Sequence, residues 1–259
     1  MTFRDFALTL IVVFLMSSHV SSAPVRVRFV EGVTHGFLVL RTSDGRLIAS
    51  GDQLQVSRDR HVESRILFRF KDGSVFDERV VFTQQQVFAM QTYQLVQRGP
   101  SFEEDNEISL KHASGQYRIK SKAKKDGQEQ VFEGTLEVPP DCYTGMLVTV
   151  AKNLPKGTTA TVHIVVFTPK PRILKLELAP AGEQQVLIGG VAKNTTHYLL
   201  KPQLGTLLKL VSKVAGRTPP DSHAWILNGD VPAFVRFEGP LYAKGPLWRI
   251  ELASPHWPG

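Results

Sequence analysis

Five turn dipeptides, each lying between short apolar or alternating runs, constrain the fold of this chain more than any other feature. They are Asp44-Gly45, Asp72-Gly73, Ser114-Gly115, Asp126-Gly127 and Asn228-Gly229. Dipeptides of this kind supply the positive φ angles that tight β-hairpins require. The pattern therefore predicts antiparallel strands that pair mainly with their neighbours along the chain.

The runs between these turns are short and rich in β-branched and aromatic residues, as strands are. The predicted strands cover residues 25–30, 37–42, 61–70, 75–83, 87–96, 117–123, 130–138, 159–168, 173–179, 195–201, 224–227, 233–237 and 247–252. No internal repeat with a period of about 20–50 residues is present, which excludes propellers and solenoids. The expected fold is mostly β: a large curved antiparallel sheet or half-open barrel built of sequential hairpins, with two short helices.

The hairpin around Asp72-Gly73 allows a test of which side chains share a face. Apolar residues alternate with charged ones along 61–70, so one face of this strand is expected to be buried. A two-residue turn would bring charged side chains of the next strand against that face, because a one-residue slip reverses every side chain. A turn of three residues, 72–74, instead pairs Phe76 with Phe70. We predict this longer turn, with Gly73 in the left-handed conformation or in a bulge.

A basic stripe runs along the strand predicted at 117–123 and its continuation. It consists of Arg118, Lys120, Lys122 and Lys124. Taken alone, the stripe suits a phosphate-bearing ligand. If a two-residue turn follows at 126–127, however, Lys124 lies opposite Glu129 and Lys120 lies opposite Glu133. Such pairs each stabilise a sheet by roughly a few tenths of a kcal/mol, so we interpret the stripe as a solvated face of paired charges.

Two segments break the β pattern. Asp141 follows two prolines and is a plausible helix N-cap, and apolar residues then recur at helical spacing as far as Pro155. The second segment, QLGTLLKLVSKVAG at 203–216, carries an apolar stripe and ends at Gly216, which suits a C-cap. This second helix is expected to pack across the concave face of the sheet, or to form a mobile lid over a ligand cavity.

The N-terminus has the layout of a secretory signal peptide. An apolar run at 7–16 follows a weakly basic start and precedes small polar residues. The run is about half the ~20 residues that a membrane-spanning helix needs, and no other run approaches that length, so we expect no transmembrane span. We predict a signal peptide at 1–22 and a single β-rich domain at 23–259. The alternative is a buried N-terminal helix.

The cysteine content and the net charge indicate where the protein is located and which partners it binds. Cys142 is the only cysteine, so an intramolecular disulfide is impossible. An exported chain of this length without disulfides suits a bacterial envelope, which predicts a periplasmic or extracellular location. The net charge of +7 favours contact with an anionic membrane surface, and export makes nucleic acid a poor partner.

The sequence lacks the familiar catalytic and cofactor motifs. It contains no nucleophile elbow, no metalloprotease helix, no phosphate-binding loop and no dinucleotide fingerprint. Its eight histidines never lie one, two or four residues apart, so we predict no local metal site. Cys142 reads most simply as a buried apolar group, and Asp230 and Glu238 as parts of a turn and a strand end. We expect no cofactor, and we favour a binding protein over an enzyme.

The closing part of the chain resembles a known family. Residues 225–232 read WILNGDVP, and Phe234, Arg236 and Gly239 follow. This pattern resembles the closing hairpin of an uncharacterised exported bacterial family, domain of unknown function 3108, and the upstream DGRLIASGD at 44–52 is similar in layout. The resemblance implies a location in the cell envelope and a concave β-sheet surface similar to that of periplasmic lipoprotein carriers. It implies no activity and no site residues.

A bent sheet that does not close leaves an apolar concavity, and such concavities suit lipids. We therefore expect non-covalent binding of an apolar or amphipathic envelope molecule, such as a lipid or acyl chain. The residues expected to line the concavity are Phe68, Phe70, Trp225 and Phe237, with ordinary core packing as their alternative. Two other functions stay open: an envelope assembly or scaffolding factor that binds proteins through a sheet edge, and an extracytoplasmic hydrolase with an acid–base pair from distant residues.

Overall fold

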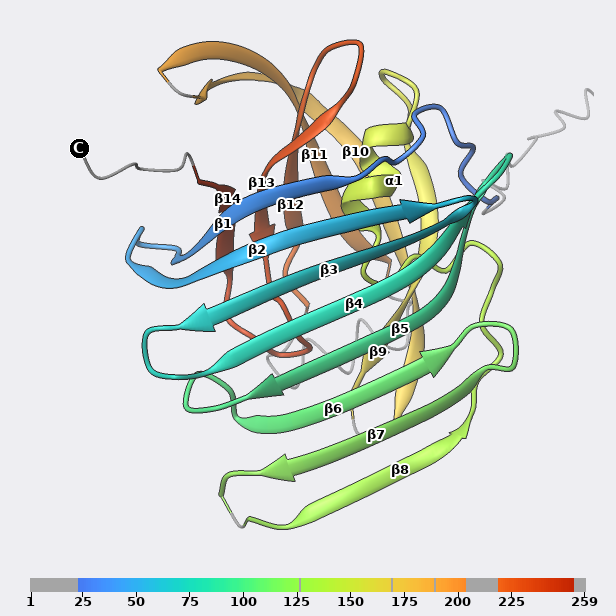
Figure 1. Ribbon diagram of the computed structural model, residues 1–259, viewed down its shortest axis with the longest axis vertical. Helices are drawn as coiled ribbons and strands as arrows, with labels where there is room; N and C mark the ends of the chain where they lie inside the picture. The colour runs from blue at the N-terminus through green and yellow to red at the C-terminus, as the bar shows by residue number, and fades with distance from the viewer. Residues whose placement is uncertain (1–22, 126, 169, 189, 204–218, 254–259) are drawn as a thin grey trace, which may run out of the picture.

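A computed structural model describes residues 23–125, 127–168, 170–188, 190–203 and 219–253 (Figure 1). These residues form strands that alternate with short turns, and one short helix. The elements in chain order are β1 (Thr34–Thr42), β2 (Leu47–Arg58), β3 (His61–Phe70), β4 (Val75–Gln84), β5 (Phe88–Arg98), β6 (Glu104–Lys111), β7 (Gln116–Ala123), β8 (Glu129–Thr135), α1 (Leu147–Asn153), β9 (Ala160–Phe167), β10 (Pro171–Ile188), β11 (Val191–Gln203), β12 (Ser222–Leu227), β13 (Ala233–Gly239) and β14 (Trp248–Leu252).

All these strands belong to one antiparallel sheet of 14 strands, in the order β8-β7-β6-β5-β4-β3-β2-β1-β14-β13-β12-β11-β10-β9. Strands that follow each other in the chain pair with each other, except β8 and β9, and β14 also pairs with β1. The end strands β8 and β9 are not paired with each other, so the sheet is not closed into a barrel. The predicted fold class, a mostly β protein with a large open antiparallel sheet, is confirmed.

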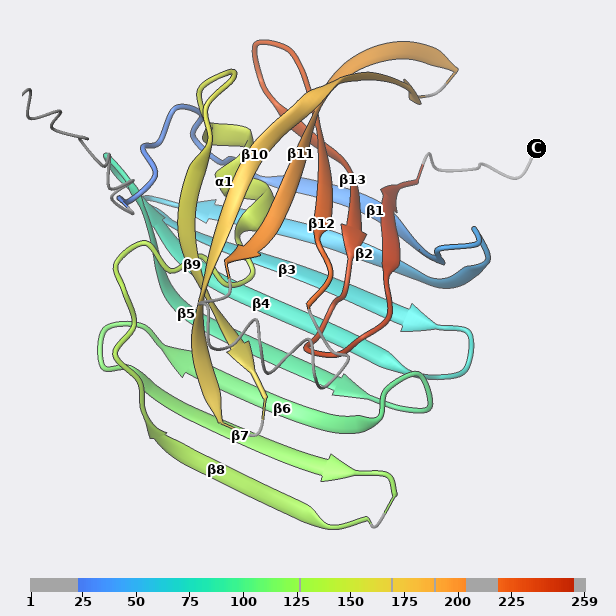
Figure 2. The same cartoon turned by 180° about the vertical axis from the view of Figure 1, so that it is seen from behind.

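The sheet curls so that its two halves face each other. Figures 1 and 2 show β1–β8 as one wall, with β9–β13 crossing behind it and α1 between the two. The core lies between the walls, because inward-facing side chains of both halves and of the helix are buried there. The largest fully buried side chains are Tyr143, Phe68, Phe76, Phe82, Phe88, Phe102, Leu38, Leu40, Met90, Leu110, Met146 and Leu178.

The turn glycines behave largely as the sequence predicts. Gly45, Gly73, Gly115 and Gly127 have φ angles of 89°, 85°, 65° and 67°. These are left-handed conformations, which glycine adopts without the steric penalty that a Cβ would bring. Gly229 is the exception, since it follows β12 without a positive φ.

The β3–β4 register differs from the prediction by two residues. The turn has three residues, as expected, but they are 71–73, because the Phe70 amide donates to the Ser74 carbonyl oxygen at 2.9 Å. Phe76 therefore lies opposite Phe68 rather than Phe70. A slip of two residues keeps each side chain on its face, so the alternation was read correctly although the pairing was wrong.

The β7–β8 register also differs by two residues. Lys122 lies opposite Glu129 and Arg118 lies opposite Glu133, so the turn is longer than two residues. The interpretation as a solvated face of paired charges is nevertheless confirmed. Ion pairs of 3.0 Å join Arg118 to Glu133 and Lys120 to Glu129.

Three segments depart from the predicted secondary structure. Residues 25–30 are not a strand: among them only Arg26 makes a β-bridge, to Val87. The strands β2 and β6 were not predicted, since both are rich in Gly, Asp, Asn, Gln and Glu, which are poor strand formers. Cross-strand pairing on both sides overrides that weak propensity in each case.

The helix prediction is correct in place but wrong at its start. Helix α1 begins at Leu147, its N-cap is Met146, and it ends just before Leu154 and Pro155. Asp141 is not the cap, because its carboxylate lies beside the ring of His163. The second predicted helix and the predicted signal peptide lie outside the described residues, apart from Gln203, which ends β11. No helix in the described ranges has the length and apolarity to cross a bilayer.

Candidate functional site

The inward face of β4 carries one ionisable residue among apolar ones. Phe76, Glu78, Val80 and Phe82 alternate on that face, and the other three are buried in the core. Glu78 lies opposite Ile66 of β3 and Leu95 of β5. The carboxyl therefore projects into the concavity from a wall that is otherwise made of hydrocarbon.

The partner of Glu78 is a phenol rather than a cation. The Tyr93 hydroxyl donates to Oε1 of Glu78 at 2.9 Å. Within the described residues this is the only hydrogen bond of the carboxyl. Burial raises the pKa of Glu78, and the Tyr93 hydrogen bond opposes that shift only in part. Burial thus makes the carboxyl easier to protonate than in water, and the protonated form is able to donate a hydrogen bond as well as accept one.

Tyr93 is held in place from across the concavity. Its ring stacks on Phe167 of β9, with centroids 5.4 Å apart and an interplanar angle of 8°. A Cβ on Gly145, which has a φ of 75°, would lie 3.2 Å from the same ring. Burial, followed by the neighbouring Glu78, raises the Tyr93 pKa well above its usual value. The phenol therefore stays protonated and remains a donor at neutral pH.

Two partly buried apolar side chains lie beside this pair and pack against the core. Ile66 lies opposite Glu78, and Phe167 stacks on Tyr93. An apolar wall with a single acid–phenol pair matches the general form of a site for an amphipathic guest: hydrocarbon for its tail and one hydrogen-bonding point for its polar group.

The structure places three of the four predicted lining residues in or against the core, and the fourth on the outward face. Phe68 and Phe70 are 0% and 6% exposed and lie in the core. Phe237 is partly exposed and packs against the core from β13. Trp225 lies on the outward face of β12, since its neighbours Ala224 and Ile226 face inward. The four are therefore not brought together, and their role in lining a ligand stays a prediction.

Trp225 belongs to a cluster on the outward face. Its ring stacks on His197 with centroids 4.5 Å apart, its Nε1 donates to Gln184 at 2.7 Å, and the Arg236 guanidinium lies 5.3 Å from its ring centre. His223 lies 2.9 Å from His197, and burial, then that neighbour, lowers the His197 pKa. The contacts account for the burial of Trp225 without a guest.

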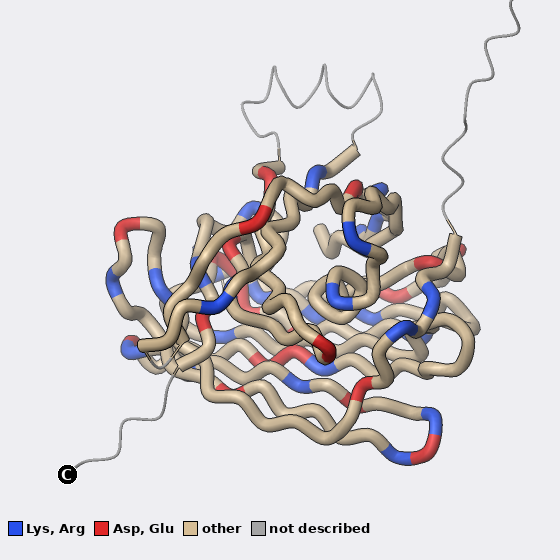
Figure 3. Tube along the Cα trace, turned by 90° about the horizontal axis from the view of Figure 1, so that it is seen from above, with Lys and Arg blue, Asp and Glu red and all other residues tan. Residues whose placement is uncertain are grey.

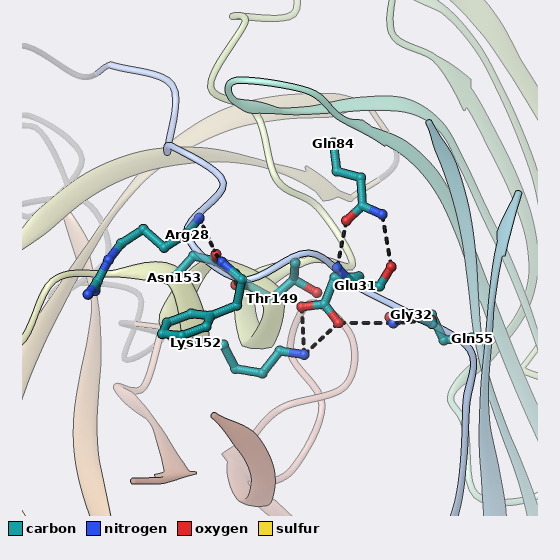
Figure 4. Close-up of polar contacts among 9 residues, drawn as sticks. Arg28, Glu31, Gly32, Gln55, Gln84, Thr149, Lys152 and Asn153 are labelled. Atoms are coloured by element: carbon teal, nitrogen blue, oxygen red, sulfur yellow. Dashed lines mark hydrogen bonds and ion pairs between the residues drawn. The ribbon is translucent and has the colours of Figure 1, made fainter. Parts of the chain in front are cut away.

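A buried polar network joins the segment before β1 to α1 and to the sheet (Figure 4). The carboxylate of Glu31, a residue that is 5% exposed, lies 2.6 Å from Lys152 of α1 and accepts from Gln55 of β2 at 2.9 Å. The Gln84 side chain bonds both backbone groups of Glu31, at 2.7 and 2.8 Å. This network ties residues 28–32, the helix and the sheet together, so it is a structural element.

Asn153, at the end of α1, also connects the helix to the segment before β1. Its Oδ1 accepts from the amides of Arg28 and Phe29 at 2.8 Å, and its Nδ2 donates to the Thr149 carbonyl oxygen at 2.9 Å. The backbone of the segment that precedes β1 is thus held at the end of the helix by the Asn153 side chain (Figure 4). Sequence reasoning assigned residues 25–30 to a strand and missed this role.

The segment 141–144 covers the outer edge of β9. The Tyr143 amide donates to the His163 carbonyl oxygen at 2.8 Å, and the His163 amide donates to the Asp141 carbonyl oxygen at 3.0 Å. Such cover blocks the pairing of an exposed strand edge with another chain. Cys142 is fully buried, and burial raises the pKa of its thiol. A reactive thiolate is disfavoured there.

The raised pKa of Glu78 leads to a pH-dependent prediction for Glu78→Gln. The pKa of Glu78 is higher in the folded state than in the unfolded state. The wild type therefore loses stability as the pH rises from the unfolded-state pKa through the folded-state pKa. The variant lacks this loss. We expect its free energy of unfolding to exceed that of the wild type by about 1 kcal/mol at pH 8, or about 2–4 °C in Tm, and to match it near pH 4.

Thermal unfolding at several pH values measures this difference. Glu107→Gln, on the outward face of β6, is the matched control and is expected to show no such pH-dependent gain. A Glu78→Gln variant that is less stable than the wild type at pH 8 would show that the carboxylate is paired rather than penalised.

Comparisons with known proteins give a distant likeness and no family. No family model matches the chain. No curated protein matches it either. A solved structure described as a β-barrel-like protein of domain of unknown function DUF1849, from Brucella abortus, is 10% identical, with a TM-score of 0.44, and the match covers 87% of this chain and 98% of that one.

The resemblance to domain of unknown function 3108 is therefore wrong. No model of that family matches the chain. The pattern that suggested it, a tryptophan strand, an Asp turn and a proline, is realised here by the β12–β13 hairpin. Turn and strand chemistry of this kind recurs in unrelated hairpins, because the same backbone geometry selects the same residues.

Proposed function

We propose that the protein binds an amphipathic molecule non-covalently in the concave face of its sheet. The hydrocarbon part of the guest lies against the partly buried apolar side chains, and its polar group lies at Glu78 and Tyr93. The observation that carries this proposal is the placement of Glu78: a carboxyl on an apolar inward face, with a phenol as its only hydrogen-bonding partner among the described residues.

The energetics of burial support a guest with a hydrogen-bonding head. A carboxyl taken out of water without a cation is costly, and core positions of this kind are normally apolar. A neutral carboxylic acid both donates and accepts, so it is able to pair with a second carboxyl or with an ester carbonyl. The proposed guest class is therefore a fatty acid or another lipid with an acyl carbonyl, bound in an envelope compartment of the exported chain.

A titration with a fluorescent fatty acid, cis-parinaric acid, tests the proposal. The wild type is expected to bind it with saturation. Glu78→Leu removes the polar partner and is expected to weaken binding about tenfold, the scale of one hydrogen bond in a low-polarity site. Glu107→Leu, which removes an exposed carboxylate on the outward face, is the matched control and is expected to bind as the wild type does.

Native mass spectrometry of the purified protein supplies a second readout. Co-purifying mass of a fatty acid or lipid is expected on the wild type and is expected to be reduced on Glu78→Leu. Absence of lipid, together with no saturable binding of the probe, contradicts the proposed function. Equal affinity of wild type and Glu78→Leu contradicts the role assigned to Glu78.

A further inference from the structure

The hairpin of β10 and β11 projects beyond the rest of the sheet. On one side β9 pairs with β10 only as far as Leu178, and on the other β12 pairs with β11 only from Thr195 onward. Residues 186–188 and 191–193 therefore pair only with each other, as a two-stranded ribbon, and the Asn194 carbonyl oxygen already accepts from the Asn228 amide at 2.9 Å. Figures 1 and 2 show this ribbon at the top of the molecule, where the β12–β13 hairpin also ends.

The end of the ribbon is apolar on both of its faces. Val186, Ile188 and Val191 share one face by pairing and alternation, and Leu187 lies on the other opposite Ala192. The side chains at the tip are open to solvent, with Leu187 75% and Val191 55% exposed. Large apolar side chains exposed together on a projecting element mark an interaction site more often than chance.

A bilayer fits this geometry better than a protein surface does. A flat protein partner covers one face of a two-stranded ribbon and leaves the other in water, whereas lipid surrounds both faces. Pairing within the ribbon satisfies the backbone groups between its two strands, and shallow insertion leaves water for those on its outer edges.

The charge near the tip favours lipids with anionic headgroups. Residues 184–194 read QQVLIGGVAKN, with one lysine and no acidic residue, and the chain as a whole carries a net charge of +7. Lys193 follows the apolar tip, where a headgroup phosphate would lie if the tip entered the acyl boundary. Figure 3 shows acidic and basic residues interspersed elsewhere along the chain, so the attraction is expected to be local and modest.

We propose that the tip of the β10–β11 hairpin docks the protein onto an anionic phospholipid bilayer, with Leu187, Ile188 and Val191 entering the headgroup–acyl boundary. Three to four residues of strand span roughly 10–14 Å, which is comparable to the ~5–10 Å depth at which interfacial segments lie. This docking is separate from guest binding in the concave face, since it involves none of the residues around Glu78.

Vesicle flotation tests the proposal with the full chain. The wild type is expected to float with vesicles of phosphatidylglycerol and phosphatidylcholine, and much less with phosphatidylcholine alone. The double variant Leu187→Asp with Val191→Asp is expected to lower the partition coefficient at least tenfold. The control is Val131→Asp on β8, an apolar residue that is 47% exposed far from the tip, and it is expected to float as the wild type does.

An environment-sensitive probe shows whether the tip itself inserts. A fluorophore on Leu187→Cys is expected to brighten and shift to the blue on adding anionic vesicles, and one on Val131→Cys is not; Cys142 is buried and does not compete for the label. The proposal is overturned if the wild type fails to float, or if the double variant floats equally well. Fatty-acid binding by the double variant is expected to be unchanged, so this outcome is distinguishable from failure of the concave site.

Discussion

Lys152→Met is expected to lower the free energy of unfolding by about 3–5 kcal/mol, the usual cost of leaving a buried charge without its partner. Lys152 lies 2.6 Å from the carboxylate of Glu31, and the two side chains are 16% and 5% exposed. Gln55 still donates to the carboxylate in the variant, but an amide does not replace the lost charge. Urea denaturation measures the loss.

Two controls separate burial from ion pairing as such. Lys156→Met removes an ion pair of the same length, 2.6 Å, to Glu183, but Lys156 is 83% exposed. We expect that change to cost less than about 1 kcal/mol. The double variant Glu31→Gln with Lys152→Met is expected to be more stable than Lys152→Met alone, because no charge is then left buried. Equal losses in Lys152→Met and Lys156→Met would show that the network does not hold the segment before β1.

Phe68→Ala is expected to destabilise the fold by about 3–5 kcal/mol, as large-to-small changes in well-packed cores do. Phe68 is 0% exposed, and its ring lies so close to β2 that a Cβ on Gly51 would be 2.5 Å from it. The surrounding strands are fixed by pairing on both sides, so they cannot collapse into the cavity. The measurement is again chemical denaturation.

Phe37→Ala is the matched control, since Phe37 is an aromatic residue on β1 that is 49% exposed. It is expected to cost less than about 1 kcal/mol. A Phe68→Ala variant that keeps its stability but loses affinity for cis-parinaric acid would place Phe68 in the wall of an open site and contradict its assignment to the packed core.

The sequence predicts which side chains of a strand point inward better than it predicts which residues pair between strands. Alternation along β3 and β4 and the glycine at the turn predict which side chains point inward, and the structure confirms them at Phe68 and Phe76. The register depends on which residues form the turn between the two strands. Alternative turns shift the pairing by two residues. Such alternatives preserve every face, so hydrophobic patterning cannot separate them.

The candidate site was missed although its signal is present in the sequence. In the run FDERVVF the alternation that buries Phe76, Val80 and Phe82 also places Glu78 on the inward face. An ionisable residue in register with a buried stripe is a departure from local consistency, and such departures tend to mark functional positions. Tyr93 could not be joined to it from sequence, because its place beside Glu78 depends on the β4–β5 register, which pairs Tyr93 with Val80.

Photo-crosslinking with a diazirine-bearing fatty acid tests the central claim most directly. After irradiation, peptide mass spectrometry of the full-length protein is expected to find the label on residues beside Glu78 and Tyr93, such as Ile66 and Phe167. The yield is expected to fall in Glu78→Leu and to stay unchanged in Glu107→Leu. Labelling confined to outward residues, or none at saturating probe, would contradict a guest in the concave face.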